Sequence, residues 1–158
     1  MAIRMKTVVQ LKAEGEAASH SRIDVDTGGL SLTIDEPEAR GGTNMGPTPT
    51  STAIAALVGC TNVIGHKVAD KLGIELSGMH VDAVADFDRR GVTLSEEIDV
   101  PFPAITLHVQ VDTAAPQADI DRLAHEVAKY CPISKVFRQA GTEIKEEWTI
   151  RNRDTAAT

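Results

Sequence analysis

The chain has 158 residues, a length that suits one domain with room for a substantial hydrophobic core. Asp and Glu outnumber Lys and Arg by 23 to 16, and the resulting charge of −7 argues against nucleic acid or an anionic membrane surface as the main partner. No apolar run approaches the ~20 residues of a membrane span, and charged residues appear too early for a signal peptide. The sequence therefore predicts a cytoplasmic protein, with an ordered core over about residues 6–150 and a frayed tail over 151–158.

The first third of the chain has the pattern of β-strands. Residues 7–14, 21–26 and 30–35 carry β-branched side chains in rough alternation with polar ones. Gly28 and Gly29 stand between the second and third of these segments, where a hairpin turn needs residues that accept a positive φ. We expect an antiparallel sheet here.

A long helix follows a loop rich in Gly, Pro and Asn. Thr48 is suited to cap its N-terminus, Pro49 to occupy its first turn, and Gly73 to end it. Every residue from 53 to 60 is apolar or small, which predicts burial on all sides of the helix there. Beyond that stretch Ile64, Val68 and Leu72 form one inward stripe, while Lys67, Asp70 and Lys71 face outward.

The second half combines strands and helices. Residues 79–88 and 104–112 alternate as two half-buried antiparallel strands joined by an exposed loop, and residues 142–150 form a last strand. A second helix begins near Pro116 and turns four apolar residues inward (Ile120, Leu123, Ala124 and Val127). The predicted fold class is α+β in a single domain over residues 1–158, with antiparallel sheets packed around the central helix.

The two cysteines are the main candidates for chemistry. Cys60 lies in the most apolar part of the long helix, where burial should raise the pKa of its thiol. Cys131 precedes Pro132, which favours a new helix whose N-terminal dipole would stabilise a thiolate. These local features rank Cys131 as the more acidic thiol. The alternative is that both are inert core cysteines, the usual state of buried free Cys.

The motifs "GGTNMGPTPTSTAIAALVGC" and "YCPISKVF" together resemble those of the OsmC/Ohr superfamily of osmotically inducible and organic-hydroperoxide-resistance proteins. The cysteines are 131 − 60 = 71 positions apart, and the order of strands and helices agrees over about residues 6–150. The resemblance implies an intertwined homodimer with its thiol site at the subunit interface.

The resemblance also implies a thiol peroxidase of the oxidative stress response. Cys60 would attack the organic hydroperoxide and become a sulfenic acid, and Cys131 would condense with it to a disulfide. A small thiol or a lipoyl-type dithiol would then reduce that bond. This chemistry requires no cofactor and no metal.

The family pattern further implies an arginine that activates Cys60 and a glutamate that holds the arginine. Arg40, in the loop before the helix, and Arg22, in the second strand, are the candidates. The glutamate position, ten residues before Cys60, is Thr50 in this chain. Both arginines could equally be ordinary solvated charges, and the chain could be a weakly active member.

The sequence raises three other functions. The five histidines (His20, His66, His80, His108 and His125) form no zinc-binding pattern. His66 and His125 are each six positions from a cysteine, which does not suit a Cys–His hydrolase. The remaining alternative is a non-catalytic dimer that binds a small hydrophobic ligand in an apolar interface pocket.

Overall fold

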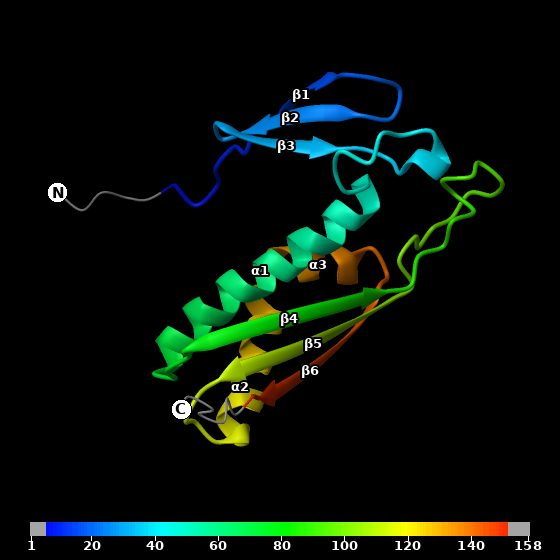
Figure 1. Ribbon diagram of the computed structural model, residues 1–158. Coiled ribbons are helices and arrows are strands. Elements are labelled where there is room, and N and C mark those ends of the chain that lie inside the picture. Colours follow the sequence, from blue (N-terminus) through cyan, green and yellow to red (C-terminus); the bar gives the residue numbers. More distant parts are fainter. Residues whose placement is uncertain (1–5, 152–158) are drawn as a thin grey trace, which may run out of the picture. The chain divides into compact units, whose positions relative to one another are not determined.

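The computed structural model describes residues 6–151, which fall into two compact units that divide between Ala53 and Ile54 (Figure 1). Two small sheets and three α-helices confirm the predicted α+β class. In chain order the elements are β1 (Glu14–Ala17), β2 (Ile23–Thr27), β3 (Leu30–Ile34), the 3₁₀ turn η1 (Glu38–Arg40), α1 (Pro49–Leu72), β4 (Gly78–Ala85), β5 (Ala104–Asp112), α2 (Gln117–Tyr130), α3 (Pro132–Gln139) and β6 (Glu143–Ile150).

The N-terminal unit contains the antiparallel sheet β1-β2-β3. Gly28 and Gly29 have φ values of +63° and +79°, as the predicted hairpin turn requires. The strand predicted over residues 7–14 is wrong for all but its last residue, because β2 pairs with Glu14–Ala17 instead. Val8 and Leu11 are 85% and 93% exposed, and no strand of this unit pairs with their segment despite its β-propensity.

A buried carboxylate organises the glycine-rich loop between β3 and α1. Asp35 accepts hydrogen bonds from the backbone N–H groups of Thr43 and Met45 and from the Thr43 hydroxyl, at 2.6–3.1 Å. These bonds hold the pKa of Asp35 well below its usual range, the Thr43 hydroxyl contributing most. The carboxylate therefore closes the loop that leads into the helix carrying Cys60.

We expect Gly42→Ala to disrupt this loop. A Cβ at position 42 would lie 1.7 Å from the carbonyl oxygen of Glu36, a backbone atom that cannot move aside alone. The substitution should lower the free energy of unfolding by about 3 kcal/mol. Urea unfolding measures this, with Gly91→Ala as the control because its Cβ would meet nothing closer than 3.8 Å. Equal stability of the two variants would contradict the described loop.

Helix α1 begins and ends as predicted. The Thr48 hydroxyl accepts the Ser51 N–H at 3.2 Å, and Gly73 has a φ of +70°. Its buried residues form one stripe, whereas Ala55, Ala56 and Gly59 are exposed in the single chain. The prediction of burial on all sides therefore does not hold within the single chain. At residues 53–60 only Leu57 is buried, because the chain covers one face of the helix.

The expectation that no segment could span a membrane also needs correction. By length and composition alone, α1 is apolar enough to cross one. The buried stripe includes Leu57, Thr61 and Val68, which pack within the protein's own fold. Core helices of soluble proteins satisfy the same criterion, so composition does not decide the location of this helix.

The C-terminal unit contains the sheet β4-β5-β6. Ile105, Leu107, Val109 and Val111 are buried, as the alternation predicted, and β4 pairs antiparallel with β5. The sheet is not wholly antiparallel, because β5 and β6 run parallel. Parallel neighbours need a crossover connection, which α2 and α3 provide. Helix α1 packs on the buried face, where a Cβ at Gly65 would lie 2.8 Å from Met79.

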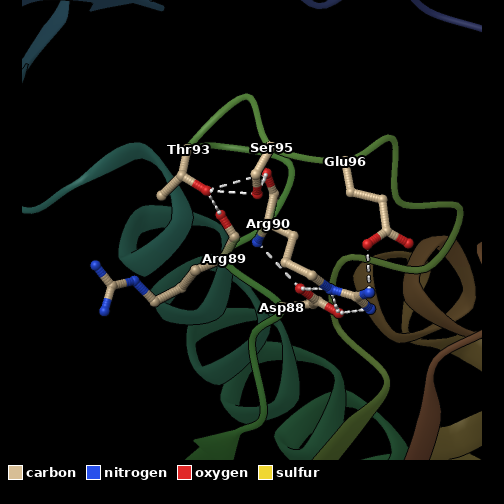
Figure 2. Close-up of polar contacts among 6 residues, drawn as sticks. All are labelled: Asp88, Arg89, Arg90, Thr93, Ser95 and Glu96. Carbon is tan, nitrogen blue, oxygen red and sulfur yellow. Dashed lines mark hydrogen bonds and ion pairs between the residues drawn. The ribbon is translucent and has the colours of Figure 1, made fainter.

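The loop between β4 and β5 is exposed, as predicted, and is internally ordered (Figure 2). The Arg90 guanidinium bridges the carboxylates of Asp88 and Glu96 at 2.7 and 2.6 Å. The Arg90 carbonyl accepts hydrogen bonds from the hydroxyls of Thr93 and Ser95. These contacts fix the loop locally without extending to either cysteine.

Candidate functional site

Cys60 lies on α1 at the edge of its buried stripe. Leu57 and Thr61, its neighbours on that stripe, are 0% and 2% exposed. Cys60 itself is half-buried and forms no disulfide. The expectation that its apolar surroundings enclose it is therefore wrong for the single chain, because one side of the helix is left open. A half-buried thiol is accessible to a small oxidant.

Cys131 forms the junction between α2 and α3. Its N–H donates to the Val127 carbonyl at 2.9 Å, which closes α2, and its Sγ accepts the Ser134 N–H at 3.5 Å, which caps α3. Pro132 occupies the first turn of α3, as the sequence predicts. The side chain of Cys131 is 1% exposed.

The expectation that Cys131 carries an acidic thiol is wrong. Burial is the largest effect on Cys131 and raises its pKa to about 11, although the Ser134 N–H at the helix N-terminus acts in the opposite direction. The sequence predicts the helix cap at Cys131 but not the burial that outweighs it. Cys131 is therefore a protonated thiol at neutral pH.

The two cysteines lie side by side within the C-terminal unit. A side-chain hydrogen bond with Cys60 and the charge of Cys60 both contribute further to the raised pKa of Cys131. Interactions of this kind require the two sulfurs to be close together. The structure thus brings together two thiols that are 71 positions apart in the sequence (131 − 60).

Alkylation should reveal the protonated state of Cys131. Below the ordinary thiol pKa of about 8.5 the folded and unfolded chains both hold this proton, so the raised pKa costs no stability. Between that value and about 11 the unfolded chain releases the proton first, and stability should fall as the pH rises.

At pH ~8 we expect iodoacetamide to leave Cys131 unmodified in the folded protein, as measured by peptide mass spectrometry. Rapid labelling of Cys131 at that pH would contradict this prediction.

The two candidate arginines lie in the N-terminal unit. Arg22 forms an ion pair with Asp24 at 2.9 Å, and Asp24 also accepts the Thr33 hydroxyl at 2.6 Å. Arg40 forms an ion pair with Glu36 at 2.6 Å. Each arginine therefore already has a carboxylate partner within its own unit.

Thr50 lies in the first turn of α1, which contains no acidic residue. Its hydroxyl is 3.1 Å from the hydroxyl of Thr48, the residue that caps the helix. Thr50 therefore supports the start of the helix and cannot form an ion pair with an arginine.

A polar network beside Cys131 was not anticipated from the sequence. Ser134, 2% exposed, accepts a hydrogen bond from Arg138 Nε at 3.3 Å. Arg138 Nη2 donates to Glu146 at 3.1 Å, and the indole N–H of Trp148 donates to the other oxygen of Glu146 at 3.2 Å. One signal in the sequence was available: Glu146 interrupts the inward apolar alternation of β6.

The histidines do not extend the site. His80 pairs with Asp82 at 3.0 Å and His108 with Glu147 at 2.9 Å, on the exposed face of the second sheet. Within residues 6–151, no three His, Cys, Asp or Glu side chains are arranged to hold a metal ion. A cavity of about 850 Å³ lies near the C-terminal end of α1, and neither cysteine lines it.

Comparison with known proteins identifies the family of this chain. The profile of the OsmC-like protein family matches residues 42–147, which include both cysteines' surroundings. The chain belongs to the OsmC-like family. No curated protein gives a significant match.

Solved structures show the same fold at low sequence identity. An OsmC-like protein from Mycoplasma pneumoniae is 14% identical, with a TM-score of 0.76 over 90% of this chain and 97% of that one. An organic hydroperoxide resistance protein from Legionella pneumophila is 19% identical, with a TM-score of 0.65 over 92% and 98%. One from Elizabethkingia anophelis is 18% identical, with a TM-score of 0.66 over 94% and 100%. At these identities the solved structures confirm the OsmC-like fold.

Proposed function

We propose that this protein is a cytoplasmic thiol peroxidase that reduces organic hydroperoxides. The observation that carries the proposal is the contact between a half-buried Cys60 and a buried Cys131. Membership of a family that includes organic hydroperoxide resistance proteins supports it. The apolar surroundings of Cys60 favour organic hydroperoxides over hydrogen peroxide.

The proposed cycle has three balanced steps. The Cys60 thiolate attacks the outer peroxide oxygen, the O–O bond breaks, and an alcohol leaves after taking up a proton. The sulfenic acid then condenses with the Cys131 thiol, which forms the S–S bond and releases water. A small thiol or a lipoyl-type dithiol finally reduces the disulfide and is itself oxidised.

A coupled assay tests this function. The purified protein should consume tert-butyl hydroperoxide in the presence of dithiothreitol, and intact mass after peroxide treatment should show the loss of two hydrogens. Absence of both signals would refute the proposal. The outcome is independent of any assumption about the arginines.

We further propose that the protein acts as an intertwined homodimer. Ala55, Ala56 and Gly59 are exposed on α1, and Val63 is 50% exposed, which leaves an apolar helix face for a second copy to cover. An obligate interface of more than ~2,000 Å² in total is expected. Sedimentation should give the dimer mass at micromolar concentration, and Ala56→Glu should shift it toward the monomer. Arg122→Glu, at an exposed position on α2, is the control. A stable wild-type monomer would contradict the proposal.

A second candidate function is a catalytically weak dimer that binds a small hydrophobic ligand. Thr50 in place of the implied glutamate favours it, as does the uncovered apolar face of α1. The described cavity is a poor site for such a ligand, because the Asp112–Arg151 ion pair at 2.7 Å lines it. Ligand binding without peroxide consumption would select this alternative.

A further inference from the structure

We propose that Arg138 and Glu146 are positioning residues that hold Cys131 in place to attack an oxidised Cys60. This inference rests on the proposed thiol-pair function. It assigns a role to the ion pair between α3 and β6, which lies in the same unit as both cysteines.

The first turn of α3 fixes the Cys131 thiol. Its Sγ accepts the Ser134 N–H at 3.5 Å, and its carbonyl accepts the Lys135 N–H at 3.1 Å. Any rotation or fraying of this turn would move the sulfur. The position of the thiol therefore depends on what holds α3.

Arg138 connects that turn to the sheet. Residues 131, 134 and 138 share one face of the helix by their spacing of three and four. On this face Arg138 bonds to the Ser134 hydroxyl at 3.3 Å and to Glu146 at 3.1 Å. One guanidinium thus ties α3 to β6 directly below the cap formed by Cys131.

Glu146 is an unexpected residue for its position in the strand. It alternates with the buried Ile144 and Trp148, and its cross-strand neighbour is Leu107, which is 1% exposed. The Glu146 side chain is only 10% exposed. Withdrawing a carboxylate from solvent is costly even when a partly exposed cation such as Arg138 pairs with it, so an apolar residue would serve stability at least as well. The pair is better explained by the orientation that it imposes on α3.

A simpler explanation is that Arg138 only stabilises its helix. A cation in the last turn interacts favourably with the helix dipole. That explanation does not account for the buried partner on β6 or for the Trp148 N–H that holds its second oxygen at 3.2 Å. The two explanations also predict different kinetics, so they can be separated by experiment.

The closing of the thiol pair can be measured without peroxide. An aromatic disulfide such as Ellman's reagent first reacts with the accessible Cys60 thiolate, which forms a mixed disulfide and releases one aryl thiolate. Cys131 then loses its proton to solvent and attacks the Cys60 sulfur, which forms the Cys60–Cys131 disulfide and expels the second aryl thiolate. The second release therefore reports the attack by Cys131 separately from the first reaction of Cys60 with the reagent.

We expect Arg138→Met and Glu146→Gln to slow the second release on the order of tenfold or more, because a small misplacement of a reacting atom is enough to do so. The first release should be unchanged. Lys135→Met is the matched control, because it removes a positive charge from an exposed position of the same helix. Arg138→Lys should restore part of the rate. Ser134→Ala should slow the second release by a smaller factor. If Arg138→Met fails to fold, this variant tests the same contact, and an unchanged second release would overturn the inference.

The outcomes are distinct. An unchanged second release in Arg138→Met and Glu146→Gln would overturn this inference and leave the proposed function intact. Equal slowing in Lys135→Met would assign the effect to helix stability and also overturn it. A wild-type protein with no second release would instead refute the thiol pair itself.

Discussion

Cys60→Ser is expected to abolish peroxide turnover completely. A serine hydroxyl does not ionise near neutral pH and is a much weaker nucleophile than a thiolate. The buried thiol of Cys131 cannot replace Cys60, because its pKa is raised to about 11. The measurement is steady-state consumption of an organic hydroperoxide with a dithiol reductant. Equal consumption by wild type and Cys60→Ser would rule out the proposed mechanism.

Cys131→Ser should separate the first step from the second. The variant is expected to reduce one equivalent of hydroperoxide and then stop, because no neighbouring thiol resolves the Cys60 sulfenic acid. Continued exposure should carry Cys60 to the sulfinic and sulfonic acids. Intact mass would show the added oxygens in this variant and only the disulfide in wild type. Sustained turnover with no over-oxidation would mean that Cys131 has no resolving role.

Thr50→Glu is expected to raise the rate of peroxide reduction on the order of a hundredfold, the usual effect of one preorganised electrostatic contact. The family pattern implies a carboxylate at this position that holds the activating arginine. In this chain Arg22 and Arg40 are paired with Asp24 and Glu36 instead. A glutamate at position 50 would compete for one of them.

The matched control is Ser51→Glu, which adds the same charge to the same helix turn at an exposed position. Both variants improve the interaction with the helix dipole, so their stability should change equally. Combining Thr50→Glu with Arg22→Met or Arg40→Met should cancel the gain at the true activating residue, since the two sites would be coupled. If Thr50→Glu has no effect in any background, the activation of Cys60 does not follow the family pattern.

Local signals predicted much of the fold because they act through nearest neighbours. Gly28 and Gly29 define a hairpin, and Thr48, Pro49 and Gly73 define the limits of α1, whatever the rest of the chain does. The junction at Cys131 was predictable for the same reason. The strand proposed for residues 7–14 was wrong because a strand needs a partner, and β-propensity does not say whether one is present.

The candidate site was predictable only in part. The spacing of the two cysteines, through the family resemblance, pointed to a pair that the structure brings together. The prediction of an acidic thiol at Cys131 was wrong because its burial, which depends on the packing of the whole unit, outweighs the effect of the helix cap that the sequence revealed. Arg138 and Glu146 were missed because the sequence does not show that α3 lies beside β6. Only that packing gives the inward carboxylate of Glu146 a cation to pair with.

The parallel pairing of β5 and β6 has a consequence for the order of events during synthesis. The chain must complete α2 and α3 and return along the sheet before β6 can join β5, so this pairing forms through a long-range contact and therefore slowly. Cys131 lies within that crossover, and Glu146 lies on the strand that completes it. While β6 is still inside the ribosome, the crossover that carries Cys131 is not yet fixed to the sheet. Cys60 then has no partner thiol in a fixed position. The proposed redox pair would thus be a product of the finished fold, and an oxidant met earlier would find a lone thiol with no second thiol to form a disulfide with it.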